Sequence, residues 1–459
     1  MSSKKLLALL IGISLVLVLV FVPLLSACSS TPTPAPTTAA PKPTTSAPAP
    51  APTTAAPKPT TSAPAPAPTT SAPAPAPTTT TAAPAPAKTL KIGILASLTG
   101  FFSGYDMAQA DECQIVADMW NDKGGLTIGG QKYNIALSVE DCKSSLDGYT
   151  AATNKMVFDQ KISFLAGPAA FFGGAVNVVS TPNKVLVSMG YDTCDPAQLS
   201  KDTPYTFLGK SGTVEAGIAA AAYMKELYPN VKNVVFLHPD DGAIPFVQPH
   251  VQKLLAAQGF SMIGDTIGYN NETVDFSPIV AKIIQRNPDA VFMINGLSTH
   301  EGNMLKGLRE AGWKKPFCVG GAAATAEVLN IAGKDAATDY FSQGIDPSQP
   351  SNPPAMQDMG KRMTAKFGAA RAAAMHLETA NGLWSLLYAI QNANSLDTTV
   401  VRDAWEKLDV IPGTLFGEGR MGGLQTYGIK HVVATGLPYI RIIDGKLVFG
   451  KWVSNIVSP

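Results

Sequence analysis

The sequence lacks the short motifs that identify common enzymes. It has no GxSxG nucleophile elbow, no P-loop, no HExxH metal motif, and no GxGxxG after its first expected strand. It also lacks an excess of either charge, because 35 lysines and arginines stand against 34 aspartates and glutamates. This balance argues against nucleic acid or an acidic surface as a partner. These absences point away from catalysis and from nucleic-acid binding.

Cysteine and histidine are scarce and are not arranged as metal ligands. None of the five cysteines forms a CxxC pair, and none of the five histidines forms an HxH or HxxxH pair. We therefore expect no metal ion and no cofactor. Cys318 lies in an apolar run, which predicts a buried thiol. Cys113, Cys142 and Cys194 all lie in the first half of the chain, where one disulfide among them is compatible with an oxidising compartment.

The first 28 residues carry the features of an exported lipoprotein. Two lysines precede an apolar run over residues 6–25, and residues 25–28 (LSAC) match the bacterial lipoprotein box. In proteins with this box the signal is cleaved before the cysteine, which then carries lipid. We therefore expect a signal peptide over residues 1–27 and a lipidated Cys28 that anchors the mature chain to the membrane outside the cytoplasm. An uncleaved transmembrane anchor is the alternative, because about 20 apolar residues can span a bilayer.

Residues 28–88 are expected to form a disordered tether. After Cys28 the stretch is almost entirely Pro, Thr, Ala and Ser, and residues 37–52 recur unchanged as residues 53–68. It has no aromatic residue and almost no charge, so nothing offsets the entropy that ordering it would cost. Its proline content favours extended polyproline II, which is typical of a semi-rigid spacer.

Beyond the tether, short apolar strands alternate with helices. Strands are expected at residues 89–96, 133–140, 162–166 and 185–189, and then again at residues 233–237, 260–269, 290–294 and 316–320. Apolar strands separated by helices predict parallel sheets that are covered on both faces. Two such runs in series predict an α/β fold with two doubly wound parallel-sheet lobes.

The carboxyl ends of the expected strands are the places to look for a ligand, because open parallel sheets bind ligands there. These ends carry six aromatic rings: Phe101, Phe102, Tyr105, Phe171, Phe172 and Tyr191. Aromatic walls favour aromatic ligands, although core packing is the alternative role for each ring. Gly173 opens a helix whose amides can hold a carboxylate. The remaining candidate ligand-binding residues are Asp192, His238, Ser298, Ala322 and His376.

Several segments resemble type I periplasmic binding proteins of the branched-chain amino-acid (Leu/Ile/Val) group, the receptors of ABC importers. They are residues 91–100 (KIGILASLTG), 117–126 (ADMWNDKGGL), 275–277 (DFS) and 308–313 (LREAGW). The resemblance implies three crossovers, near residues 207–208, 342–344 and 427–431. Lobe 1 would then comprise residues 89–208 and 343–428, and lobe 2 residues 209–342 and 429–459. It also implies a monomer that delivers a small molecule to a permease and ATPase complex.

The expected ligand differs from that of the amino-acid receptors. Those hold the ligand's carboxylate with a serine after strand three and its ammonium with a glutamate of the second lobe. Here Phe171 and Phe172 stand in place of the hydroxyls, and residues 321–324 (GAAA) in place of the glutamate. Because an unpaired ammonium in a closed cleft is costly, we expect an aromatic or apolar carboxylate. The alternatives are an amino acid or amide in a non-standard site, a ligand sensor for a signalling partner, and an enzyme with this fold.

The resemblance also bears on the cysteines. Amino-acid receptors of this group carry a half-cystine after the second strand, at the position of Cys142. Their partner position is an alanine here, so the resemblance implies a disulfide from Cys142 to Cys194 or to Cys113. Cys318 is expected to stay reduced.

The lipid anchor is testable by removing its thiol. We predict that Cys28→Ala shifts the protein from the membrane fraction to the soluble fraction, because the variant has no thiol to acylate. Fractionation followed by mass spectrometry of the N-terminus would measure this. Retention of the variant in the membrane with its signal uncleaved would instead favour the transmembrane anchor.

Overall fold

The computed structural model describes residues 86–169 and 171–454. The chain divides into two units, Met1–Thr80 and Thr81–Pro459, and all described residues belong to the second. The expected signal peptide, Cys28 and nearly all of the tether therefore lie outside the described residues. Within the described ranges, no helix is long and apolar enough to cross a membrane.

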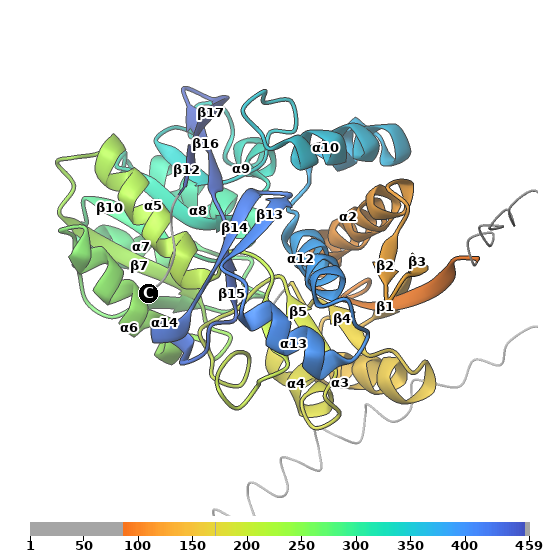
Figure 1. Ribbon diagram of the computed structural model, residues 1–459. Coiled ribbons are helices and arrows are strands. Elements are labelled where there is room, and N and C mark those ends of the chain that lie inside the picture. Colours follow the sequence, from red (N-terminus) through yellow and green to blue (C-terminus); the bar gives the residue numbers. More distant parts are fainter. Residues whose placement is uncertain (1–85, 170, 455–459) are drawn as a thin grey trace, which may run out of the picture. The chain divides into compact units, whose positions relative to one another are not determined.

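The first of two sheets has nine strands. They are β1 (Lys88–Ala96), β2 (Leu126–Ile128), β3 (Gln131–Asp141), β4 (Phe164–Ala166), β5 (Leu186–Met189), β6 (Thr206–Leu208), β13 (Val410–Thr414), β14 (Gly417–Gly422) and β15 (Val432–Ala434). Their order is β13-β14-β15-β6-β5-β4-β1-β3-β2 (Figure 1). The strands from β15 to β3 pair in parallel, while antiparallel pairs occur toward the two edges.

The second sheet has eight strands. They are β7 (Asn233–Pro239), β8 (Ser261–Met262), β9 (Ile267–Tyr269), β10 (Ala290–Met293), β11 (Phe317–Ala322), β12 (Tyr340–Gln343), β16 (Leu437–Ile443) and β17 (Lys446–Val453). The path β17-β16-β12-β11-β10-β7-β8 is completed by β9, which also pairs with β7. The single strand expected over residues 260–269 is two short strands, because the chain turns at Gly264 with a positive φ of 65°.

Helices connect the strands of both sheets. With the first sheet belong α2 (Ser103–Asp122), α3 (Leu146–Asn154), a π-helical turn (Lys155–Asp159), α4 (Gly173–Ser180), α10 (Pro354–Phe367), α11 (Ala369–Ala373), α12 (Glu378–Ala393), α13 (Thr398–Glu406) and α14 (Leu424–Tyr427). With the second belong α5 (Thr213–Leu227), α6 (Ile244–Ala257), α7 (Ser277–Arg286), α8 (Ser298–Glu310) and α9 (Thr325–Ala332). Figure 1 shows α2 and α12 side by side, and the two helices are in contact.

Successive buried side chains of the strands join clusters on opposite faces of each sheet, so both faces are covered. In β7, Val234 and Phe236 join one buried cluster and Val235 joins another, because successive strand side chains point to opposite faces. In β1, Ile94 and Leu95 divide between two clusters in the same way. The expected α/β fold with two doubly wound lobes is confirmed.

The chain passes between the two sheets three times. The first passage follows β6, the second follows β12, and the third lies between β15 and β16. The third therefore comes after Ala434, later than the expected residues 427–431. The cause is that the backbone oxygen of His431 accepts the Leu208 amide at 2.8 Å, which keeps this segment paired with β6.

The expected disulfide is absent, because Cys113, Cys142, Cys194 and Cys318 are all free and buried. Cys113 and Cys142 belong to different hydrophobic clusters of the first lobe. The Cys194 amide donates to the Asp192 carboxylate at 2.9 Å, which holds Cys194 in a separate loop. Because all four thiols are free, the structure corrects the predicted pairing of Cys142 with Cys194 or Cys113. Burial also raises the pKa of all four thiols.

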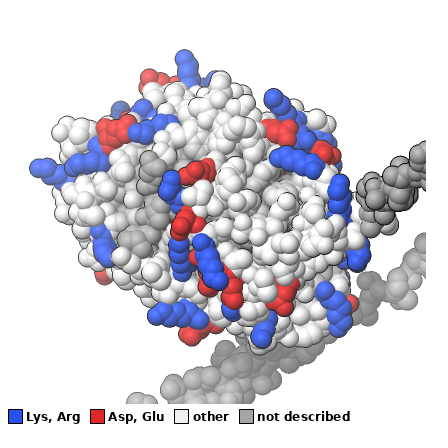
Figure 2. All heavy atoms as spheres, in the orientation of Figure 1, with Lys and Arg blue, Asp and Glu red and all other residues white. Residues whose placement is uncertain are grey.

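The surface agrees with the balanced composition. Figure 2 shows lysines and arginines interspersed with aspartates and glutamates, with wide uncharged areas between them. The visible face therefore carries no broad patch of one sign, as the near equality of acidic and basic residues indicated.

A buried glutamate in α8 predicts a pH-dependent stability. Glu301 Oε2 accepts the Tyr340 hydroxyl, and burial raises the pKa of Glu301 from 4.5 to about 8. The folded state therefore holds this proton more tightly than the unfolded state. The resulting stability is complete below about pH 4.5 and is lost as the pH rises to about 8. We predict that Glu301→Gln flattens this decline in unfolding free energy, measured by urea unfolding across that range. Identical pH profiles for the two proteins would contradict the prediction.

Candidate functional site

A cavity opens where the strands of both sheets end. It contains about 700 Å³ of empty space, counting the part that is open to solvent. The first lobe and first passage contribute Phe102, Tyr105, Ala169, Phe171, Tyr191, Asp192, Lys210, Ser211, Gly212 and Glu378. The second lobe and second passage contribute Thr213, Ala216, Pro239, Asp241, Asn271, Asn295, Gly296, Leu297, Gly321, Ala322 and Gln343.

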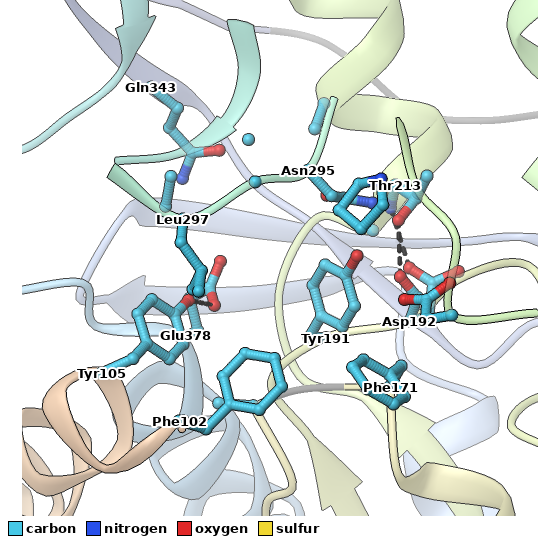
Figure 3. Close-up of a pocket in the computed structure, with 18 of the residues that line it drawn as sticks. Phe102, Tyr105, Phe171, Tyr191, Asp192, Thr213, Asn295, Leu297, Gln343 and Glu378 are labelled. Carbon is cyan, nitrogen blue, oxygen red and sulfur yellow. Dashed lines mark hydrogen bonds between the residues drawn. The ribbon is translucent and has the colours of Figure 1, made fainter. Parts of the chain in front are cut away.

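Four aromatic rings form the first-lobe wall of the cavity. Figure 3 shows Tyr105, Phe102 and Phe171 along one side, with the Tyr191 ring reaching in between them and Asn295. Phe102 and Phe171 pack edge to face, with ring centroids 5.6 Å apart. These rings offer flat apolar surface, which suits the face or edge of an aromatic ligand.

The structure brings six of the sequence-predicted residues to the cavity wall: Phe102, Tyr105, Phe171, Tyr191, Asp192 and Ala322. Three neighbours of these residues lie elsewhere. Phe101 is 42% exposed and is not part of the lining, and Phe172 is 2% exposed in the lobe core, stacked on Tyr149 at 4.5 Å. Gly173 is not among the residues that line the cavity, so the expected anion site at the start of α4 is not on the cavity wall.

Three further predicted residues lie behind the cavity rather than in it. His238 is fully buried at the end of β7, and its ring contacts Asn295. Ser298 Oγ accepts the Ala324 amide at 2.9 Å, which joins the start of α8 to the loop after β11. The His376 ring packs on Tyr105 with centroids 4.3 Å apart, and burial lowers its pKa to about 4. These side chains support the wall and do not line it.

A buried ion pair on the cavity wall was missed by sequence reasoning. Lys210 Nζ donates to Glu378 Oε1, with the two side chains only 5% and 3% exposed, and the Tyr105 hydroxyl donates to Glu378 Oε2. Lys210 directly follows the carboxyl end of β6, so reading that strand end would have indicated it. Nothing near Glu378 in the sequence marks it, because its place depends on how α12 packs.

The first lobe holds Glu378 in position through α2. Glu112 accepts the amides of His376 and Leu377 at 2.8 Å each, and Gln109 accepts the Thr379 amide at 2.7 Å. Burial raises the pKa of Glu112 to about 8. These bonds satisfy backbone amides at the start of α12 that have no partner within the helix. The first residue of α12, Glu378, is thereby fixed against Tyr105.

Asp192 also lines the cavity, but its oxygens are already occupied. Oδ1 accepts the Thr213 amide at 2.8 Å, and Oδ2 accepts the Cys194 amide at 2.9 Å and the Tyr427 hydroxyl at 2.7 Å. The carboxylate thus lies at the positive N-terminal end of α5. Asp192 joins the first lobe to the start of the second, and it has little capacity left for a ligand ammonium.

A family model described as periplasmic binding protein matches residues 89–432. The chain belongs to this periplasmic binding protein family. Solved structures with the same fold include a branched-chain amino acid transporter substrate-binding protein from Streptococcus pneumoniae in complex with isoleucine. Its identity to this chain is 19%, its TM-score is 0.63, and the match covers 80% of this chain and 100% of that one.

Two other structures extend the comparison. A leucine-binding protein from Thermotoga maritima is 18% identical, with a TM-score of 0.63 over 80% of this chain and 99% of that one. A solute-binding protein from Rhodopseudomonas palustris in complex with benzoate is 16% identical, with a TM-score of 0.62 over 81% and 98%. At these identities the likeness shows the fold.

As a member of the periplasmic binding protein family, this chain is an extracytoplasmic binding protein. The predicted resemblance to the branched-chain amino-acid group is confirmed. The position of the cavity follows the rule for open parallel sheets, at the strand ends where the chain changes sheet.

The buried ion pair gives a prediction for stability. Lys210→Met should lower the free energy of unfolding by about 3–5 kcal/mol, because Glu378 is left as a buried charge without its cation. Lys210→Met combined with Glu378→Gln should recover much of the loss, since no charge remains unpaired. Urea unfolding at neutral pH measures both.

A matched control is the exposed pair Lys306–Glu310, whose side chains are 50% and 65% exposed. Lys306→Met should cost at most about 1 kcal/mol. Equal losses for Lys210→Met and Lys306→Met would contradict the assignment of Lys210 as a buried partner of Glu378.

Proposed function

We propose that this periplasmic binding protein captures a small aromatic or apolar carboxylate between its lobes and delivers it to an ABC importer, while lipid on Cys28 anchors it to the membrane. The observation that carries the proposal is the pairing of one nearly buried cation with four aromatic rings in one cavity. The rings pack against the apolar body of the ligand, and Lys210 pairs with its carboxylate.

Lys210 has the capacity to bind a second carboxylate. An ammonium group carries three N–H donors, and in the described part of the chain Lys210 uses one hydrogen bond, on Glu378. A ligand carboxylate on the remaining donors would give an arrangement of two carboxylates around one ammonium. Charge-assisted hydrogen bonds of this kind are about twice as strong as neutral ones.

An ordinary amino acid fits this cavity less well. Its ammonium needs a carboxylate partner, but Glu378 is held by Lys210 and Tyr105 and Asp192 by three donors. Asp241 is the cavity carboxylate that is least engaged, with Oδ1 accepting the Ala243 amide at 3.0 Å. The benzoate complex of the Rhodopseudomonas palustris protein supports the view that this fold can hold an aromatic acid. The isoleucine complex is an example of an amino acid on the same fold.

Binding calorimetry with benzoate and leucine tests the proposal. We predict that benzoate binds and that Phe171→Ala weakens it ten- to a hundredfold, because burying one ring is worth roughly 2–3 kcal/mol. Phe101→Ala is the matched control, since Phe101 lies outside the cavity lining and should leave binding unchanged. Submicromolar leucine binding, or equal benzoate affinity in wild type and Phe171→Ala, would show that the ligand class or the site is wrong.

A further inference from the structure

The wall of the second lobe is fixed by a buried histidine. The His238 ring lies at the end of β7 with Nδ1 2.7 Å from the Pro239 carbonyl oxygen. A carbonyl oxygen only accepts, so Nδ1 carries the proton. Burial lowers the pKa of His238 and keeps the ring neutral, so Nε2 is an acceptor. The neighbouring carboxylates Asp240 and Asp241 oppose this shift without reversing it.

The tautomer of His238 sets the direction of the Asn295 amide. Asn295 Nδ2 lies 3.3 Å from His238 Nε2, and it donates because Nε2 accepts. The reverse orientation would set the Asn295 oxygen against the lone pair of the imidazole. Asn295 Oδ1 is therefore turned away from His238, and Figure 3 shows this amide at the cavity, across from the Tyr191 ring.

On the same wall, the oxygen of a second side-chain amide receives no hydrogen bond from the described residues. Gln343, at the end of β12, is 1% exposed, and its Oε1 has no hydrogen-bond partner among the described residues. Asp241 adds a carboxylate to the same lobe's share of the lining. The second lobe thus presents oxygen acceptors to the cavity, and an acceptor that is desolvated without a donor loses free energy.

We infer that Asn295, Gln343 and Asp241 recognise a hydrogen-bond donor, a hydroxyl or an amino group, on the part of the ligand that lies away from its carboxylate. The inference rests on the proposed function, because it takes the carboxylate to lie at Lys210. Figure 3 shows Glu378, the partner of Lys210, beside Tyr105 on one side of the Tyr191 ring, and Asn295 above the hydroxyl end of that ring. A hydroxylated or aminated aromatic acid matches both ends, and His238 acts as a positioning residue for Asn295.

Calorimetry on the full chain with a set of related acids tests the inference. The probes are benzoate, 3- and 4-hydroxybenzoate, 4-aminobenzoate, and 4-methoxybenzoate, which resembles the hydroxy acid but cannot donate. We expect at least one hydroxy or amino acid to bind ten times more tightly than benzoate and 4-methoxybenzoate, because a site built to bond a donor rejects the analogue without it.

Two failures are distinguishable. If benzoate binds as tightly as every donor-bearing acid, the inference is wrong and the proposed function stands. If none of the acids binds, the proposed function and the inference both fail. Because this comparison uses the unmodified protein, it does not depend on whether a variant folds.

Two variants then assign the recognition to residues. Asn295→Leu should reduce the preference for the donor-bearing acid over 4-methoxybenzoate to about threefold or less, because the acceptor for the donor is removed. His238→Phe should reduce the same ratio, because Asn295 is released, whereas a merely structural loss would weaken all acids alike. An unchanged ratio in Asn295→Leu would overturn the assignment.

Discussion

The buried pair of Lys210 and Glu378 is the constraint on which the cavity depends. The Glu378 carboxylate is only 3% exposed and needs a cation as partner. Glu378 is the first residue of α12, and its partner Lys210 lies on the first passage between the sheets. The contact of α2 with α12 supports this arrangement, because Glu112 and Gln109 take up the amides around Glu378. The pair is neutral as a whole, so it costs less to enclose than a lone charge would. It also leaves two of the three lysine N–H donors for a ligand, because Lys210 makes one hydrogen bond among the described residues.

The other main charged group of the cavity, Asp192, is already bonded to groups of the protein. Asp192 receives donors from three segments and closes the positive end of α5. A helix start in such a place would otherwise be an attractive anion site. With that site taken, the polar groups that the second-lobe wall offers are the amides of Asn295 and Gln343 and the carboxylate of Asp241. His238 orients one of them, Asn295.

The fold could be predicted from sequence because strands such as β1 and β7 contain continuous apolar runs that are buried on both faces, and such runs are local features of the sequence. The site could be predicted only in part. Phe171 and Phe172 are adjacent, yet one ring lines the cavity and the other stacks on Tyr149, a choice made by the turn that begins α4. Lys210 and Glu378 are 168 residues apart, and only the packing of α12 brings them together. His238 was expected at the cavity, but its ring is fully buried, and its neighbour Asn295 lines the cavity instead.

Several cavity residues belong to the passages that join the sheets, and this links binding to the relative placement of the lobes. Lys210 and Gly212 lie on the first passage, and Gln343 is the last residue of β12, directly before the second. Ser211 Oγ accepts the Thr435 amide at 2.8 Å, which fastens the first passage to the third. A ligand shifts a conformational equilibrium only by the difference in its affinity for the two states. A ligand that contacts the passages and both walls of the cavity loses contacts when the passages bend. It therefore favours the arrangement in which the aromatic rings and Lys210 face the oxygen acceptors of the second lobe. Recognition of both ends of one ligand would therefore couple binding to closure of the lobes. In the proposed function, a transporter would bind the closed arrangement.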